Sequence, residues 1–240
     1  MAAIEVSNLV KSYGSIEALK GITFEVKDGE IFGLIGPNGA GKTTALRVVA
    51  TLLEITAGKV SVFGYDVKKN PEKVREKISY LPEEAGAYKN LSGREYLTFM
   101  AQFYTNGKDA DTMLERGISI SGLEERITDK VGTYSKGMTR KLLVARALMM
   151  EPPLAILDEP TSGLDVINSQ EVRKIIKAFA QRGSTVLLSS HNMLEVEFLS
   201  DKVALIGEGV ILDTGTPQEL KQRYEAQNLE EVFMEAVANE

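Results

Sequence analysis

The sequence predicts an α/β protein with a mainly parallel sheet, because short, uninterrupted apolar runs alternate with helical patterns. The three clearest runs are almost uniformly apolar, as expected for strands buried on both faces, and they span residues 31–35, 154–157 and 185–188. A polar residue or a glycine follows each run: Gly36, Asp158 and Ser189. Because ligands of parallel sheets bind at the carboxyl ends of the strands, these residues mark one edge as the candidate site.

The other elements surround this core. The first 30 residues alternate as antiparallel strands do, with apolar positions at Ile4, Val6, Ile22, Phe24 and Val26. Helical patterns dominate from about residue 84 to 150, and this stretch is expected to form a helical subdomain inserted between two core strands. We therefore expect a single domain over residues 1–240, without internal repeats.

Capping signals mark where the helices begin. Ser92 and Glu95 have the spacing of a capping box, in which each side chain binds the other residue's backbone N–H. A second helix is expected from Ser135, and residues 216–219 contain another capping box with proline at its first helical position. One apolar face is predicted for the first of these helices, at Tyr96, Phe99, Met100 and Phe103.

Composition excludes several classes of protein. The 240 residues include no cysteine and one histidine, which excludes a disulfide framework, a thiolate nucleophile and a multi-histidine metal centre. The 28 basic residues against 34 acidic ones give a net charge of −6, which argues against nucleic acid as a partner. No stretch has the roughly 20 apolar residues of a membrane span, and residues 1–6 lack signal-peptide features. We expect a soluble, cytoplasmic chain.

A phosphate-binding loop is the most specific signal. Residues 36–43 read Gly-Pro-Asn-Gly-Ala-Gly-Lys-Thr and match G-x-x-x-x-G-K-[ST]. In such a loop the backbone N–H groups surround phosphate oxygens, Lys42 reaches the outer phosphates and the Thr43 hydroxyl binds Mg²⁺. The alternative is a glycine-rich turn with an exposed lysine, but here a strand precedes the loop and a helix follows it. The predicted nucleotide-binding residues are Gly36, Pro37, Asn38, Gly39, Ala40, Gly41, Lys42, Thr43 and Thr44.

These features together predict a P-loop NTPase core with an N-terminal antiparallel β subdomain and the inserted helical subdomain. Asp158 at the tip of a buried strand is the usual partner of a phosphate loop and is predicted to hold Mg²⁺ through water; a helix-capping acid is the alternative. Glu159 next to it is suited to orient or deprotonate an attacking water, unless it is a solvated loop acid.

Two further features accompany these carboxylates. His191 follows the third buried strand and could hydrogen-bond the γ-phosphate, although a lone histidine is more often a packed or surface residue. Ser135, Lys136, Gly137 and Met138 open a helix with free N–H groups, which is a possible second anion site or an ordinary helix cap.

With these motifs the sequence resembles the ATP-binding-cassette (ABC) ATPases over nearly its whole length. Residues 36–43 and 154–159 resemble the two phosphate-loop motifs, and residues 133–138 resemble the family signature, with Ser135 and Gly137 kept and Lys136 and Met138 changed. Residues 161–165 resemble the D-loop, His191 falls at the switch histidine, and Tyr13 falls where the family stacks an aromatic ring on adenine. A simple turn tyrosine is the alternative for Tyr13.

One departure from the family concerns Glu83, which stands where the family normally has glutamine. The resemblance implies that this residue contacts Mg²⁺ or the attacking water and links the site to a transmembrane partner. Glu83 can still accept hydrogen bonds from metal-bound water, but it adds a negative charge near Asp158 and Glu159. The implied catalytic residues are Lys42, Glu159 and His191, and the implied metal-binding residues are Thr43, Asp158 and Glu83.

The resemblance also implies the partners. Two ATPase subunits, identical or different, would pair head to tail, with Ser135, Lys136, Gly137, Met138 and Asp165 of one facing the nucleotide of the other. We expect ATP hydrolysis with Mg²⁺ as cofactor, a separate polytopic permease as partner, most simply an exporter, and a peripheral position on the cytoplasmic face of the membrane. The alternatives are a soluble ABC-type ATPase acting on ribosomes, DNA or iron–sulfur assembly, and a nucleotide-binding scaffold that does not hydrolyse. Glu159 and His191 argue against the scaffold.

Overall fold

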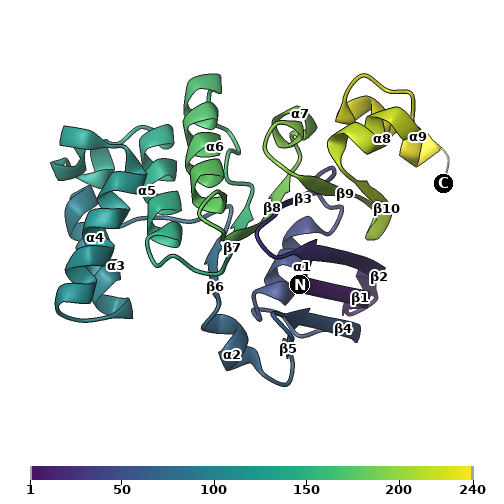
Figure 1. Ribbon diagram of the computed structural model, residues 1–240, viewed down its shortest axis with the longest axis horizontal. Coiled ribbons are helices and arrows are strands. Elements are labelled where there is room, and N and C mark those ends of the chain that lie inside the picture. Colours follow the sequence, from purple (N-terminus) through teal and green to yellow (C-terminus); the bar gives the residue numbers. More distant parts are fainter. Residues whose placement is uncertain (1, 239–240) are drawn as a thin grey trace.

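A six-stranded sheet forms the centre of the computed structural model, which describes residues 2–238 (Figure 1). Its strand order is β10-β9-β3-β8-β7-β6, and all neighbouring strands are parallel except β10 and β9. The bounds are β3 (Ile31–Ile35), β6 (Ile78–Leu81), β7 (Leu154–Asp158), β8 (Thr185–Ser190), β9 (Lys202–Gly207) and β10 (Val210–Gly215). Every residue of β3, β7 and β8 is buried, which confirms the three predicted strands.

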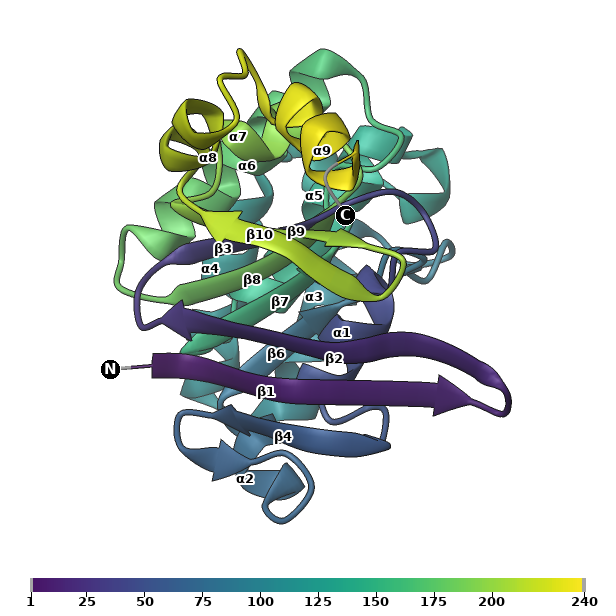
Figure 2. The same cartoon turned by 90° about the vertical axis from the view of Figure 1, so that its right-hand side faces the viewer.

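An antiparallel sheet with the order β2-β1-β4-β5 contains the N-terminal strands. Its members are β1 (Ala2–Tyr13), β2 (Ile16–Lys27), β4 (Ala57–Val62) and β5 (Tyr65–Asp66). Figure 2 shows β1 and β2 running across the molecule below β9 and β10. Helix α1 (Lys42–Val49) contributes its apolar side chains to one core shared with both sheets. The predicted N-terminal antiparallel subdomain is confirmed.

Helices cover the other face of the central sheet and share a second core with it. They are α3 (Gly93–Tyr104), α4 (Lys108–Ser121), α5 (Lys136–Leu148), α6 (Val166–Ala180), α7 (Met193–Glu197), α8 (Pro217–Arg223) and α9 (Leu229–Ala238). The short helix α2 (Pro71–Arg75) lies beside β5, and the 3₁₀ helices η1 (Glu124–Thr128) and η2 (Val131–Thr133) precede α5. None of the helices within residues 2–238 is long and apolar enough to cross a membrane.

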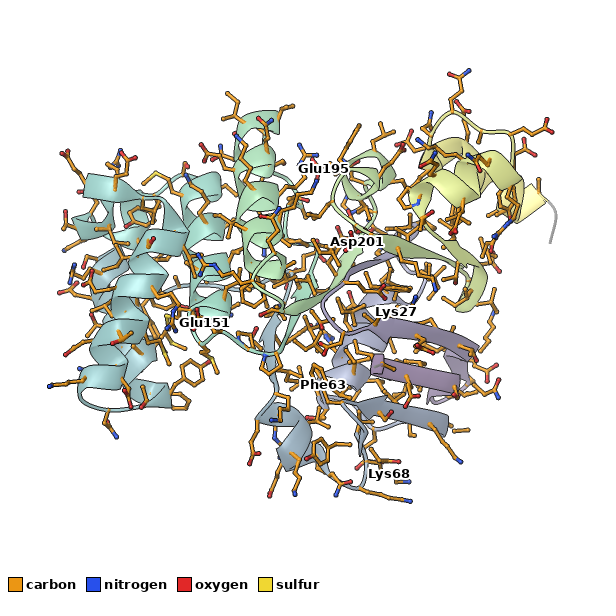
Figure 3. All side chains as sticks on the ribbon, viewed as in Figure 1. Lys27, Phe63, Lys68, Glu151, Glu195 and Asp201 are labelled. Atoms are coloured by element: carbon orange, nitrogen blue, oxygen red, sulfur yellow. The ribbon has the colours of Figure 1, made fainter. Side chains whose placement is uncertain are left out.

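Helices α3, α4 and α5 follow β6 and precede β7, and they form one end of the molecule in Figure 1. Glu151, labelled in Figure 3, lies in the turn from α5 to β7 and pairs with Arg116 of α4 at 3.0 Å. These helices lie within the predicted stretch of about 84–150. The division of residues 1–240 into a domain with an inserted subdomain stays a prediction, and Met1 and residues 239–240 lie outside the described residues.

The predicted helix caps are present, but one predicted apolar face is only partly covered. Ser92 accepts the N–H of Glu95 at 3.2 Å and Glu95 accepts the N–H of Ser92 at 2.7 Å, which is the expected capping box. On the same helix Tyr96 is buried, whereas Phe99 and Phe103 are exposed, Phe103 by 76%. The helical spacing was predicted correctly, but the spacing does not determine whether another element covers the face.

Candidate functional site

The phosphate-binding loop begins where β3 ends. Gly36 donates its N–H to the carbonyl of Ser190 at 3.2 Å, which fixes the start of the loop to β8. A Cβ at Gly36 would lie only 2.0 Å from the carbonyl oxygen of Ile206, so no larger residue fits there. Gly41 at the cap of α1 has φ 105°, which lets the chain turn directly into the helix. The loop is thus shaped by close backbone contacts as well as by its own sequence.

Lys42 is folded back over this loop. Its ammonium donates to the carbonyl oxygens of Gly36 at 2.8 Å and Pro37 at 3.1 Å. The same ammonium lies 3.4 Å from Oε1 of Glu159, and both side chains are buried. The only cation in direct contact with Glu159 among the described lysines and arginines therefore comes from the loop itself.

Asp158 lies at the tip of β7 and is fully buried. Its Oδ1 accepts hydrogen bonds from Ser189 Oγ at 2.6 Å and Thr43 Oγ1 at 3.0 Å, and its Oδ2 accepts one from Tyr80 at 3.4 Å. Burial raises the pKa of Tyr80, so its hydroxyl stays a donor. Sequence reasoning missed Tyr80, although β6 is the parallel neighbour of β7 and places Tyr80 opposite Ile156.

The Thr43 hydroxyl and the Asp158 carboxylate present the oxygen ligands that Mg²⁺ prefers. Residues 2–238 hold no cluster of three or more His, Asp or Glu side chains arranged around a common point for a metal ion. Phosphate oxygens and water would therefore complete the coordination of a metal ion here, as is usual for Mg²⁺ in nucleotide sites. The residues fit a metal that arrives with a nucleotide.

Glu159 is 4% exposed, so the alternative of a solvated loop acid is wrong. It has φ 48°, in the left-handed region that residues other than glycine rarely adopt. Its N–H donates to Ser189 Oγ at 3.0 Å, and its Oε2 lies 2.8 Å from His191 Nδ1. Ser189 thus contacts both carboxylate residues, while the two side chains point to different partners, as their alternation on the strand predicted.

A pocket of about 310 Å³ opens between these groups. It is lined by Ala18, Asn38, Gly39, Gly41, Lys42, Thr43, Thr44, Glu83 and Glu159. The structure thus brings Glu83 to the loop, and Glu83 Oε1 accepts a hydrogen bond from Ser162 at 3.3 Å. Tyr13 is not among these lining residues; it is 46% exposed at the end of β1, with the Lys11 ammonium 5.0 Å from its ring centroid.

The signature residues Ser135 to Met138 do not line this pocket either. They form the start of α5, where Ser135 Oγ accepts the N–H of Met138 at 3.2 Å. Asp165 caps α6 and accepts from the backbone N–H of Asn168 at 2.9 Å and from its Nδ2 at 2.6 Å. These hydrogen bonds lower the pKa of Asp165. A Cβ at Gly137 would lie 2.2 Å from the Asn168 amide, so the two helix ends are in contact.

The loop, the hydroxyl–carboxylate pair and the buried acid next to it define a P-loop nucleoside triphosphatase. Within that class the chain belongs to the ABC transporter family, whose sequence pattern matches residues 19–162. It is an ATP-binding domain and an ATPase.

Known relatives cover nearly the whole chain. The linearmycin resistance ATP-binding protein LnrL of Bacillus subtilis is 38% identical over 222 residues, which are 92% of this chain and 71% of the relative. The bacitracin transport ATP-binding protein BcrA of Bacillus licheniformis is 38% identical over 221 residues, which are 92% of this chain and 72% of the relative. A solved structure of the ATP-binding subunit of an ABC transporter is 30% identical, with a TM-score of 0.85 over 98% of this chain and 99% of that one.

Proposed function

We propose that this chain is the ATPase subunit of a transporter and drives export through a separate transmembrane permease. The observation that carries the ATPase part of this proposal is Glu159, which is buried, held by His191 and faces the same pocket as Lys42. The family, and relatives named for resistance to or transport of antibiotics, support the transport role and the export direction.

The proposed chemistry follows from the contacts of each group. The N–H groups of residues 38–44 bind the phosphates of ATP, and Lys42 exchanges the loop carbonyls for the outer phosphates. Mg²⁺, held by Thr43, Asp158 and Glu83, would neutralise phosphate charge when bound. Glu159 accepts the proton of the attacking water.

His191 keeps the Glu159 carboxylate in place, and its half-exposed ring is left accessible to a γ-phosphate. Tyr13, at the end of β1, is proposed to stack on the adenine ring.

The chain is proposed to work as a head-to-tail dimer of identical or related subunits. Residues 135–138 and Asp165 lie outside the pocket formed by the loop, so they are free to face the nucleotide of a second subunit. Val166 and Ile167 next to Asp165 are exposed apolar residues, which supports a protein contact at this helix end. ATP would then lie between two chains.

The permease is proposed to dock on an aromatic surface of the helical region. Four exposed rings gather at α3 and in the segment before it: Tyr88, Phe99, Phe103 and Tyr104. The ring centroids of Tyr88 and Phe99 lie 5.8 Å apart, and those of Phe103 and Tyr104 lie 5.7 Å apart. Tyr88 follows Glu83 by five residues, so a helix of the permease seated here would act on the segment that enters the pocket. This chain would then lie on the cytoplasmic face of the membrane.

The remaining alternative is an ABC-type ATPase without a membrane partner. Where a reading frame next to this chain's gene encodes a polytopic membrane protein, co-expression with that protein separates the two. We expect co-purification with the wild type, and loss of it for Phe103→Ser but not for Met234→Ser, which removes a similarly exposed apolar side chain on α9. Equal retention of the wild type and both variants would contradict the docking surface, and no complex with the wild type would favour the alternative.

The Glu159→Gln variant tests hydrolysis and the dimer together. The amide keeps the shape of the side chain but cannot accept a proton, so ATP should bind and turnover should be lost. We expect a stable dimer on size exclusion with ATP, while Glu84→Gln, at the exposed acid that follows Glu83 in the sequence, keeps wild-type turnover. A Glu159→Gln protein that remains monomeric with saturating ATP would rule out the head-to-tail dimer.

A further inference from the structure

Arg140 is a buried cation beside the pocket for which the proposed mechanism has no role. It lies on α5 and is 7% exposed. Its Nη2 donates to the main-chain carbonyl of Glu83 at 2.9 Å, and its buried Nη1 has no hydrogen-bond partner among the described residues. Burying a guanidinium while the two N–H donors of Nη1 are unused is costly unless nearby negative charge offsets the loss of water.

That negative charge comes from the site itself. Burial lowers the pKa of Arg140, and the carboxylates of Glu83, Asp158 and Glu159, in that order, oppose the shift. Guanidinium groups stay protonated in proteins, so Arg140 carries a fixed positive charge that is attracted by these three acids. Lys42 alone would leave these acids with an excess of negative charge, and bound ATP would add more.

Glu83 is the member of this group with the least support of its own. Its side chain is exposed and accepts one hydrogen bond, from Ser162. Asp158 and Glu159 are buried, and each has several polar contacts. Arg140 holds the Glu83 segment from α5, through the main chain. Glu83 is therefore fixed between α5 and the segment that leads to Asp165.

We propose that Arg140 is a positioning residue for ATP hydrolysis, which fixes Glu83 at the pocket and balances the charge that this third carboxylate brings. This inference rests on the proposed function only for its effect on turnover. The charge balance and the Glu83 contact exist in the nucleotide-free chain. The effect of removing the acid at residue 83 is thus expected to depend on whether the cation at residue 140 is present.

A double-mutant cycle tests this dependence with Arg140→Gln, Glu83→Gln and both together. Removing only the cation leaves three acids without balance, so Arg140→Gln should lower kcat on the order of tenfold with less change in KM for ATP. Removing the charges of both Arg140 and Glu83 returns the net charge of the site to its wild-type value, so the double variant should recover most of the lost kcat. Arg140→Lys keeps the charge and should retain more activity than Arg140→Gln.

The same cycle is measured as Tm without nucleotide or Mg²⁺. Arg140→Gln should lower Tm by roughly 4–8 °C, and Glu83→Gln should lower it less in the Arg140→Gln background than in the wild type. Lys141→Gln, on the same helix but paired with Glu171 at 2.7 Å, is the control and should show no coupling to Glu83→Gln. Additive effects in both readouts, or wild-type kcat in Arg140→Gln, would overturn the proposal. Coupling in Tm in a protein without ATPase activity would instead contradict the proposed function.

Discussion

At the scale of single residues, one hydroxyl organises the two carboxylates of the site. Ser189 donates to Asp158 at 2.6 Å and accepts the N–H of Glu159 at 3.0 Å. Glu159 also has a positive φ, which costs on the order of 1–3 kcal/mol for a residue other than glycine. Hydrogen bonds from neighbouring residues therefore hold the strained backbone at Glu159 in place. Ser189 makes two of them, to the Asp158 carboxylate and to the Glu159 N–H.

Ser189→Ala should destabilise the protein and slow hydrolysis. The change leaves the Glu159 N–H and one lone pair of the Asp158 carboxylate unsatisfied in a buried site, a loss of about 1–3 kcal/mol. Chemical denaturation measures the stability, and phosphate release measures the rate. Ser79→Ala is the matched control, because Ser79 is a buried serine whose hydroxyl has no partner in the described chain. Equal effects of the two substitutions would contradict the assigned contacts.

A second residue-scale prediction concerns Gly137. Alanine normally favours a helix over glycine by about 1 kcal/mol, but a Cβ here would lie 2.2 Å from the Asn168 side chain. Gly137→Ala should therefore destabilise by about 1–3 kcal/mol through overpacking. In an Asn168→Ala background the amide is gone, and Gly137→Ala should become neutral or stabilising in urea denaturation. Persistence of the full loss in that background would show that the contact is not the cause.

At the scale of elements, the sequence predicted the features that depend on local patterns, but it did not predict the contacts between residues far apart in the chain. The three buried strands, the phosphate loop and the cap at Ser135 depend on residues close in sequence, and the structure has them as predicted. Tyr80, Arg140 and Asn168 reach the site or the signature helix across separate elements, so no local spacing reveals them. Parallel pairing of β6 with β7 was the only available signal for Tyr80.

Exposure is the other property that spacing could not predict. Phe99 and Phe103 have helical spacing with the buried Tyr96, yet no described element covers them. The spacing of apolar residues in a helix indicates which of them share a face, whereas their burial depends on where the neighbouring helices pack. The candidate docking surface could therefore be recognised only from the structure.

The capping box at the start of α3 gives the element-scale prediction. Ser92→Ala removes the acceptor for the Glu95 N–H and should cost about 1 kcal/mol, or roughly 2–4 °C in Tm. Thr98→Ala is the control within the same helix, because its hydroxyl only bonds back to the carbonyl of Arg94. Calorimetry compares the two. A larger loss for Thr98→Ala would mean that the cap does not stabilise this helix.

At the scale of the whole molecule, the predicted site residues are divided between two regions. One pocket is lined by residues 38–39 and 41–44 of the loop together with Glu83 and Glu159, whereas residues 135–138 and Asp165 lie at adjoining helix ends outside it. The net charge of −6 gives no general attraction to polyanions, so phosphate binding depends on a few N–H groups and Lys42. In the proposed dimer, a second chain would bring its residues 135–138 and Asp165 to the nucleotide bound in this pocket.

Mixing two inactive variants tests whether each site combines the phosphate loop of one chain with the signature helix of the other. Lys42→Ala removes the ammonium of the loop, and Ser135→Arg places a bulky side chain at the signature helix end, so each homodimer should lack turnover. In a mixed head-to-tail dimer both defects fall in one site and the other is intact. Half of the dimers are mixed after random exchange, so about one quarter of the sites (1/2 × 1/2) should be intact. Recovery of ATPase activity toward that level, absent from each variant alone, is the expected result. If Ser135→Arg alone keeps wild-type turnover, or if wild-type activity per chain does not fall on dilution, each chain hydrolyses ATP without a partner.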